Sequence, residues 1–433
     1  MNNIDNIYKE LGEHICLYPF FGAFYQTNNV VPVDVENSAN SVRPCSIVMA
    51  DDSRNELLRE KWAVTNDSVR ESRNSPVWKK MREDFVQGRF HEIHDCRSCS
   101  YNERSGTTSP RQQNNKFLSE FLQVDIVSEV KKIIANDYNV NDIITLDYYP
   151  SNYCNYACVM CAGGASSKRQ TFEVKFLNKQ EKIVMHDADP DFFQQLDHVQ
   201  LINFTGGETV LQKQVHQIMD YLIEKDLARN ILITLLTNAS SSANELEDKF
   251  QHFRQVIYNV SVDGVGEVIE YQRRGCNWET VSRNALELMN HPRISTVVNY
   301  VLTGINVFSA MDFVNWCYDA GFGPHNPEDE SGSFVNISPV FRVDHLGQGA
   351  VPPELRAIAL ERLQLGRKRF ENLDTIFDRY YLGLVDRIIS VIETTPYNPD
   401  YLPQFIEHIR REDAASKKAL VDVVPEWRPY FQS

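Results

Sequence analysis

Short apolar runs occur at six places in the middle of the chain, and each has the length and composition of a buried β-strand. Helical stretches lie between them, so strand and helix alternate. This alternation predicts an α/β fold in which parallel strands form a partial (β/α)6 barrel of the TIM type. The expected strands are Ile143–Tyr149, Val199–Phe204, Asn230–Leu236, Val256–Val262, Thr296–Leu302 and Phe334–Val340.

The segments on either side of the expected barrel have a different pattern. Before it, turn-rich sequence surrounds one clear helix, with Ser75 as N-cap, Pro76 at the first helical position and apolar residues four apart. After it the chain is largely helical, and an apolar stripe falls at spacings of three and four on Phe377, Tyr381, Leu384, Ile388 and Ile392. We therefore expect an N-terminal cysteine-containing module at 1–125, a linker at 126–142, the barrel at 143–341 and a helical region at 342–433.

Composition and charge narrow the class of protein. The formal charge is −15, with 59 acidic against 44 basic residues, which argues against a nucleic-acid partner. No apolar run approaches the ~20 residues that cross a bilayer, and residues 1–5 lack the features of a signal peptide. Nine cysteines, seven of them in metal-like settings, fit a reducing compartment. We expect a cytoplasmic protein with no membrane partner.

Three of the cysteines follow the first expected strand within eight residues. Cys154, Cys158 and Cys161 are separated by three and then two residues. Iron–sulfur clusters are usually held by four cysteine thiolates, so three in one loop leave one iron without a protein ligand. A zinc knuckle with a remote fourth ligand is the alternative.

A glycine pair follows the second expected strand. Gly206 and Gly207 allow the backbone to approach a ligand closely, and Glu208 adds an acceptor at the strand end. A turn capped by glutamate is the ordinary interpretation. The cysteine loop that precedes it along the chain favours a binding role, because active sites of β/α barrels lie at the carboxyl ends of the strands.

The cysteine spacing and the Gly-Gly-Glu segment together resemble the radical S-adenosylmethionine (SAM) superfamily. The resemblance implies a [4Fe-4S] cluster on Cys154, Cys158 and Cys161 whose open iron is chelated by SAM. It also implies that Gly206, Gly207 and Glu208 bind the amino group of SAM. Further candidate contacts to SAM are Met160, Asn238, Ser261, Asp263, Arg274 and Asn299.

The reasons for these further candidates differ. Met160 stands where the family often has an aromatic residue and could cover the adenine. Ser261 and Asp263 resemble a family segment that reaches SAM or its ribose, and strand alternation points both the same way. For Asn238 a turn cap, and for Arg274 a cation at a helix end, are the structural alternatives. Asn299 on a buried strand needs a hydrogen-bonding partner, which a ligand could supply.

Cys276 lies in a loop next to Arg274. Some radical enzymes keep a thiol that returns a hydrogen atom to the product, and Cys276 is the candidate for that role. An ordinary loop cysteine is the alternative, because reactivity requires a particular microenvironment.

Four cysteines precede the barrel. Cys96 and Cys99 form a CxxC pair, and Cys16 and Cys45 can complete a tetrahedral set. The arrangement resembles the shortened auxiliary-cluster module called SPASM or twitch, which implies a second [4Fe-4S] cluster. A structural zinc site has the same ligand set and stays open as an alternative.

These resemblances imply a reaction class. The expected enzyme cleaves SAM reductively to a 5′-deoxyadenosyl radical and takes a hydrogen atom from its substrate, with the auxiliary cluster in electron transfer. The expected substrate is a peptide or protein side chain, and a small molecule such as a sugar or natural-product intermediate is the alternative. An electron donor such as flavodoxin or ferredoxin is implied. A zinc-braced interaction protein without catalysis is the interpretation from a different class.

Overall fold

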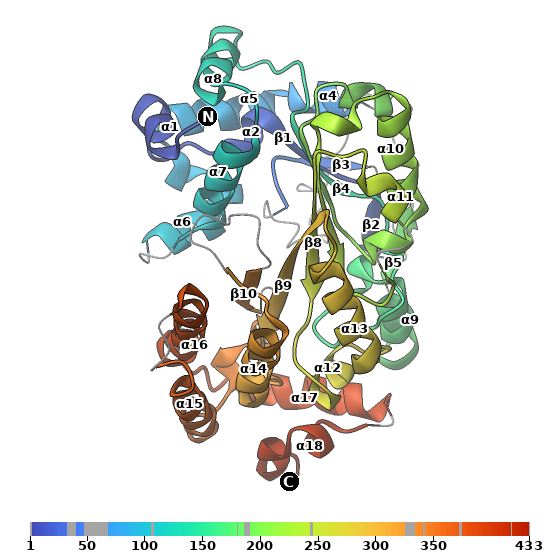
Figure 1. Cartoon of the computed structure of the whole chain (residues 1–433), viewed down its shortest axis with the longest axis vertical. Helices are drawn as coiled ribbons and strands as arrows, with labels where there is room; N and C mark the ends of the chain where they lie inside the picture. Colours follow the sequence, from blue (N-terminus) through green and yellow to red (C-terminus); the bar gives the residue numbers. More distant parts are fainter. Residues whose placement is uncertain are drawn as a thin grey trace. The chain divides into compact units, whose positions relative to one another are not determined.

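The computed structural model describes residues 2–32, 40–46, 68–104, 108–179, 181–185, 191–242, 246–324, 334–340, 343–371, 375–416 and 418–432. They form two compact units (Figure 1). The first unit contains residues 1–152, 180–235 and 249–255, and the second contains residues 153–179, 236–248 and 256–433. Each unit is described by itself.

The first unit is built on parallel strands (Figure 1). β4 (Thr145–Tyr149) pairs in parallel with β6 (Leu201–Phe204), which pairs in parallel with β7 (Leu232–Thr237). On the other side of β4 lies β1 (Gly22–Gln26), also parallel, and β3 (Ser41–Arg43) runs antiparallel to β1. The strand order is therefore β7-β6-β4-β1-β3. Two strands from the N-terminal segment thus extend the sheet, and the apolar pattern did not predict them.

Side-chain alternation gives β4 two different faces. Tyr148 packs against Tyr25 and Phe192, with ring centroids 5.9 and 5.3 Å away, and Leu146 is fully buried. Asp147 and Tyr149 point to the opposite face, because successive side chains of a strand alternate. That face carries the Gly-Gly turn, since the ring of Tyr149 lies against Gly206.

Helices from the N-terminal segment pack in the same unit. They are α1 (Ile4–Leu11), α2 (Tyr18–Phe21), α4 (Val69–Arg73), α5 (Pro76–Val86), α6 (Arg97–Arg104), α7 (Pro110–Phe121) and α8 (Ile126–Ala135). The helix predicted from Ser75 is α5, with its N-cap at that serine. The same unit contains α10 (Lys213–Glu224) and a two-stranded antiparallel sheet of β2 (Asn28–Pro32) and β5 (Glu181–Met185).

Two buried arginines fix the segment that carries Cys16 into β1. The guanidinium of Arg82 donates to the carbonyl oxygens of Pro19 (2.7 Å), Tyr138 and Arg73. Arg73 in turn donates to the carbonyls of Phe20 and Gly22, both at 3.1 Å.

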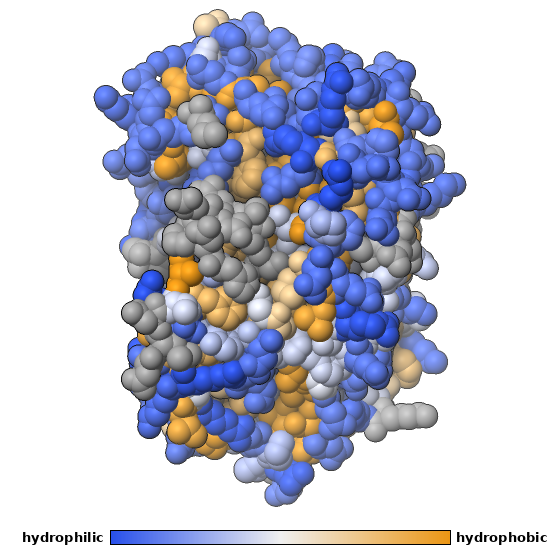
Figure 2. All heavy atoms as spheres, in the orientation of Figure 1, coloured by the Kyte–Doolittle hydropathy of each residue, from blue (hydrophilic) through white to orange (hydrophobic). Residues whose placement is uncertain are grey.

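Hydrophilic residues cover most of the visible face of the first unit (Figure 2).

The second unit contains three parallel strands, β8 (Gln255–Ser261), β9 (Ile294–Leu302) and β10 (Phe334–Pro339), in that order. Residues of β9 alternate between buried and half-buried along its whole length. The buried side packs against helices, and the rings of Tyr300 and Phe313 lie 4.3 Å apart. The half-buried side carries polar residues, Asn299 among them.

Helices make up the rest of the second unit. They are α9 (Ser167–Phe176), α12 (Glu267–Gln272), α13 (Trp278–Met289), α14 (Ala310–Ala320), α15 (Pro353–Arg367), α16 (Ile376–Thr394), α17 (Tyr401–Ala414), α18 (Leu420–Val423) and α19 (Arg428–Phe431). α14, α15 and α16 pack together, and α16 also contacts β10 (Figure 1). The predicted C-terminal stripe lies on α16, where four of its five residues are buried.

All six predicted strands are present, each within three residues of its expected bounds at either end. The α/β class, the mostly parallel strands and the helical C-terminal region are confirmed. The strand order has open ends at β3 and β10, as in a partial TIM-type barrel. The expected barrel end at 341 lies outside the described residues. In the part of the chain described, no helix combines the length and the apolar character that crossing a bilayer requires.

Candidate active site

The loop after β4 gathers its three cysteines into one patch of the second unit. Cys154 and Cys158 are buried together with Tyr156, and Cys161, Met160 and Cys276 pack against them. Cys161 is the most exposed of the three loop thiols. The structure therefore brings together the three thiols that the sequence singled out, with Met160 and Cys276 beside them.

Backbone hydrogen bonds hold the loop in this conformation. The amides of Ala157 and Val159 donate to the carbonyls of Arg274 (2.9 Å) and Gln272 (2.8 Å). At the other flank, the hydroxyl of Ser167 bonds both the amide and the carbonyl of Cys154, each at 3.2 Å. Ser166, the N-cap of α9, donates to the carbonyl of Tyr156. The loop is thus tied to residues 272–274 on one side and to the start of α9 on the other.

Burial and the neighbouring positive charge of Arg273 act in opposite directions on the loop thiols. Burial raises the pKa of Cys158, while the nearby guanidinium of Arg273 lowers it and the charges of Cys161 and Cys154 raise it further. Burial, followed by the charge of Cys154, raises the pKa of Cys161 to about 11. The free thiols of Cys158 and Cys161 are therefore protonated at neutral pH. A metal cluster would displace those protons, and Arg273 would balance part of its negative charge.

Arg273 is fixed by a buried carboxylate. Its guanidinium lies 2.6 Å from Oδ2 of Asp263, whose side chain is fully buried. The other oxygen of Asp263 accepts the amide of Val301 at 2.8 Å. Burial alone would lower the pKa of Arg273, but the charges of Asp263 and then Cys158 raise it above its ordinary value. Both oxygens of Asp263 thus have partners within the chain.

Asn238 reaches the loop from the segment after β7. Its amide nitrogen lies 3.8 Å from the sulfur of Cys154 and donates to Asn155 at 2.9 Å. Its oxygen accepts the amide of Ser240 at 2.9 Å. Asn238 therefore caps the turn after β7, which was the structural alternative to a ligand contact. Its amide also lies near the sulfur of Cys154.

A polar row crosses the half-buried side of β8, β9 and β10. Asn299 lies in register with Ser261 on one neighbouring strand and with Asn336 on the other. It accepts a hydrogen bond from Asn336 at 3.0 Å and donates to Asn259 at 3.4 Å. Asn299 was expected to need a hydrogen-bonding partner, and the side-chain amides of Asn259 and Asn336 supply it. Ser261 lies beside Asn299 on the same side of the strands.

Arg274 and Cys276 have distinct surroundings. Arg274 pairs with Glu412 of α17, with Nη1 to Oε2 at 2.7 Å, and its guanidinium lies 4.6 Å from the ring centroid of Phe172. Burial raises the pKa of Cys276 to about 11, against the opposing charge of Arg273. Cys276 therefore holds a protonated thiol, which is the form that can give up a hydrogen atom.

The glycine pair adopts the conformation that only glycine takes without strain. Gly206 and Gly207 have φ of +82° and +48°. A β-carbon on Gly206 would lie 2.6 Å from the ring of Tyr149, so the site also lacks room for a larger residue. Glu208 follows with its side chain buried in the first unit. The turn ends β6 and presents its backbone at the carboxyl end of the strand.

Residues 148–317 match the family described as Radical SAM superfamily, a segment that begins in β4 and ends in α14. This segment is therefore similar to a radical SAM domain. No curated protein matches the chain.

Two solved structures resemble the chain in part. One is SuiB from Streptococcus suis bound to precursor peptide SuiA, with 14% identity, a TM-score of 0.37 and coverage of 66% of this chain and 64% of that one. Another is native anSMEcpe with bound AdoMet and Kp18Cys peptide, with 18% identity, a TM-score of 0.36 and coverage of 53% and 61%. The chain spans less than two thirds of the length of either protein.

The four N-terminal cysteines lie close enough in the first unit for their charges to influence one another. Burial raises the pKa of Cys96, and the charges of Cys16, Cys45 and Cys99 raise it further. Burial raises the pKa of Cys16 as well, followed by the charge of Cys45. Such effects act only over short distances, although Cys45 follows β3 and Cys96 directly precedes α6.

No three His, Cys, Asp or Glu side chains of the described residues are placed to hold a single metal ion. One zinc ion draws its sulfurs to about 2.3 Å from the metal. A four-iron cluster instead binds each cysteine at a separate iron.

Asp147 is a titratable residue that the sequence analysis did not single out. It lies on β4 beside Asn203 of β6, which donates to it at 3.2 Å, and Asn203 in turn accepts from Thr234 of β7. Burial raises the pKa of Asp147 to about 7, partly offset by the bond from Asn203. The sequence did offer a signal for Asp147, because a carboxylate is unusual within the apolar run of a predicted strand.

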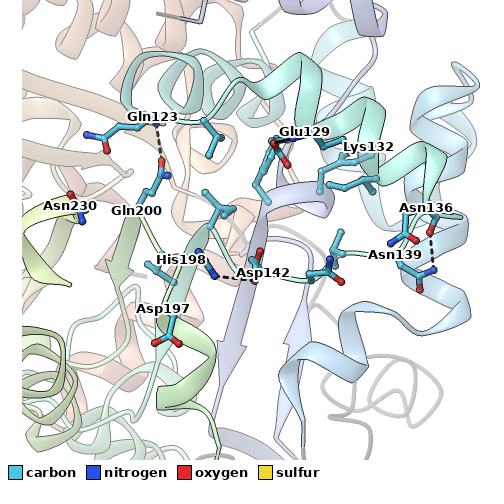
Figure 3. A pocket seen from close by; sticks show the side chains of 18 residues that line it. Gln123, Glu129, Lys132, Asn136, Asn139, Asp142, Asp197, His198, Gln200 and Asn230 are labelled. Atoms are coloured by element: carbon cyan, nitrogen blue, oxygen red, sulfur yellow. Dashed lines mark hydrogen bonds and ion pairs between the residues drawn. The ribbon is translucent and has the colours of Figure 1, made fainter. Parts of the chain in front are cut away.

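A separate hollow of about 770 Å³ lies in the first unit (Figure 3). Its wall includes Ile144, Gln200 and Asn230, which precede β4, β6 and β7, so it opens at the amino ends of the strands. Gln200 accepts the amide of Gln123 there, and His198 faces Asp142 at 3.7 Å. Because β/α barrels place catalysis at the carboxyl ends, the hollow is distinct from the candidate active site.

Proposed function

We propose that the protein is a radical SAM enzyme whose [4Fe-4S] cluster is held by Cys154, Cys158 and Cys161. The observation that carries the proposal is the shared patch of these three thiols, held by main-chain bonds within a domain of this superfamily. When bound, the cluster and SAM supply the reductive cleavage that yields a 5′-deoxyadenosyl radical, which takes a hydrogen atom from the substrate. The protein orients the reactants and excludes water.

The residues around the patch have separate proposed roles. Arg273 places positive charge beside Cys158, and Asp263 acts through Arg273 by fixing its guanidinium. Asn238 and Asn299, with Ser261, offer amide and hydroxyl groups to the nucleoside. Met160 covers the adenine as a polarizable apolar contact. Gly206, Gly207 and Glu208 bind the amino group of SAM. As an alternative to oxidation of the substrate radical, we propose that Cys276 gives that radical a hydrogen atom; an electron from the flavodoxin or ferredoxin and a proton then restore the thiol from its thiyl radical.

Arg274 was a candidate contact for the carboxylate of SAM. Its pairing with Glu412 supports a different role, since that pairing occupies one edge of the guanidinium. We propose that Arg274 anchors residues 272–274, which hold the cluster loop by backbone hydrogen bonds.

We propose that Cys16, Cys45, Cys96 and Cys99 bind a second [4Fe-4S] cluster that accepts an electron from the substrate. The mutual proximity of the four thiols supports this assignment. The proposed substrate is a peptide or protein side chain, because the N-terminal cysteine pattern resembles a module of peptide-modifying enzymes. A flavodoxin or ferredoxin in the cytoplasm would supply the electron for SAM cleavage.

The test is anaerobic reconstitution, reduction and incubation with SAM, with 5′-deoxyadenosine measured by mass spectrometry. The parent protein should form it and Cys158→Ala should not. Cys317→Ala is the matched control, because Cys317 is buried in α14 and belongs to neither set of cysteines. A parent protein that carries a full cluster and forms no 5′-deoxyadenosine would refute the proposal.

Iron and sulfide counts test the auxiliary site. Two four-iron clusters give about eight irons per chain. Cys96→Ser should bring the count to about four and leave SAM cleavage in place. Zinc in the parent protein, with about four irons, would instead indicate the structural site.

A further inference from the structure

The C-terminal helix α17 contacts both segments that hold the cluster loop. These segments are α9, whose first residues bond Cys154 and Tyr156, and residues 272–274, whose carbonyls accept the amides of Ala157 and Val159. Both lie in the second unit, as does α17. The loop is therefore linked through two neighbours to a helix near the end of the sequence.

Glu412 makes the central contacts. Its side chain is fully buried, and its two carboxylate oxygens lie 2.7 Å from Nη2 of Arg169 on α9 and 2.7 Å from Nη1 of Arg274. Its main-chain oxygen accepts a further bond from Arg274 at 2.8 Å. One carboxylate thus joins the two segments that flank the loop.

Neighbouring groups add to this junction. Arg169 also pairs with Glu173 at 3.2 Å, and the second oxygen of Glu173 accepts the amide of Gly163, just past Cys161. His408, one turn before Glu412, contacts the main chain of Val159 and bonds His345 at 3.2 Å. Burial and the charge of His345 lower the pKa of His408 to about 3, so its imidazole is neutral.

The junction is sensitive to loss of Glu412. Arg169 keeps Glu173 as a partner, but Arg274 would keep only a main-chain acceptor and lose its carboxylate. A buried charge without its partner is strongly destabilising, whereas pairs at the surface contribute little. The guanidinium would turn toward water, and residues 272–274 would move with it.

We propose that Glu412 is a positioning residue for the cluster loop. By pairing with Arg169 and Arg274 it sets the spacing between α9 and residues 272–274, and that spacing keeps the three thiols in one patch. The catalytic meaning of this role rests on the proposed function, but the positioning itself does not. The helical C-terminal region is, on this view, part of the cluster site.

Hydrogen exchange of the reduced, metal-free protein tests the positioning directly. Glu412→Gln should speed exchange at the amides of Ala157 and Val159 about tenfold or more, while β9 amides keep their parent rates. Glu412→Asp retains the charge on a shorter stem and should restore part of the protection. The matched control is Glu407→Gln on the same helix, because Glu407 is exposed and pairs with Arg411 at the surface.

Two results would overturn the inference. One is unchanged exchange at Ala157 and Val159 in Glu412→Gln. The other is equal acceleration in the loop and in β9, which would make Glu412 a general stabiliser of the unit. A second readout is the electron paramagnetic resonance spectrum of the reduced cluster with SAM, which Glu412→Gln should alter and Glu407→Gln should not.

The enzymatic proposal and the positioning role of Glu412 can be refuted independently of each other. Hydrogen exchange involves neither cluster nor SAM, so a negative result there leaves SAM cleavage untouched. A parent protein that forms no 5′-deoxyadenosine would refute the enzymatic proposal and leave the exchange result standing.

Discussion

Substitution of Asp147 by asparagine should change how stability depends on pH. Asp147 is 4% exposed, and the side-chain amide of Asn203 donates a hydrogen bond to it. Burial raises the pKa of Tyr18, and the charge of Asp147 raises it further. Burial raises the pKa of Asp147 from 3.8 to about 7. The folded protein therefore keeps a proton on Asp147 at pH values where the unfolded chain has lost it.

The sign and size follow from proton linkage. Between pH 4 and 7 unfolding releases a proton from Asp147, so rising pH favours the unfolded chain and stability falls. The shift spans about three pH units at about 1.36 kcal/mol each, which gives a loss of about 4 kcal/mol that is complete near pH 8. Asparagine has nearly the same shape and no charge at any of these pH values.

Urea unfolding of the reduced, metal-free protein between pH 5 and 8 measures this difference. Asp147→Asn should exceed the parent by about 2 kcal/mol at pH 5 and by about 4 kcal/mol at pH 8. Asp197→Asn, an exposed carboxylate of the same unit, is the control and should follow the parent. If Asp147→Asn lost stability relative to the parent as pH rises, the buried carboxyl would be ionised and the reasoning wrong.

Three further substitutions test the candidate site. Gly206→Ala should weaken SAM binding and lower the free energy of unfolding by about 1–2 kcal/mol, because φ is +82° and the new methyl group would meet the ring of Tyr149. Calorimetry measures the binding, and urea unfolding measures the stability. Cys276→Ser should leave 5′-deoxyadenosine formation intact and lower the ratio of product to 5′-deoxyadenosine, since a hydroxyl gives up hydrogen less readily; an unchanged ratio would make Cys276 a packing residue. Asn299→Ala should raise KM for SAM with little change in kcat, which steady-state kinetics would show, and an unchanged KM would place the nucleoside elsewhere.

The barrel strands and the cluster loop were predictable because their signals are local. Each strand is a short apolar run, and three thiols within eight residues need no knowledge of the rest of the chain. β1 was missed because its pairing with β4 depends on contacts between residues more than a hundred positions apart, and β3 joins the sheet only through β1. The apolar pattern within β1 is short and adjoins helix α2 without a turn signal between them.

Partners of charged residues were the least predictable part of the site. Arg274 was expected to contact SAM, and its carboxylate partner lies on a helix that offered no chemical motif. Asp263 was expected to face a ligand, and the structure gives both of its oxygens to Arg273 and Val301. These pairings depend on burial, because a charged side chain that is removed from water needs a partner of opposite charge.

The pairing of Glu412 with Arg169 and Arg274 has a consequence for biosynthesis. At about 5–20 residues per second, translation places Glu412 outside the ribosome roughly 10–50 s after Cys161. A nascent chain that exposes the cysteine loop therefore lacks the brace that closes it. Iron delivery would then be expected to follow synthesis of α17, when this helix can dock.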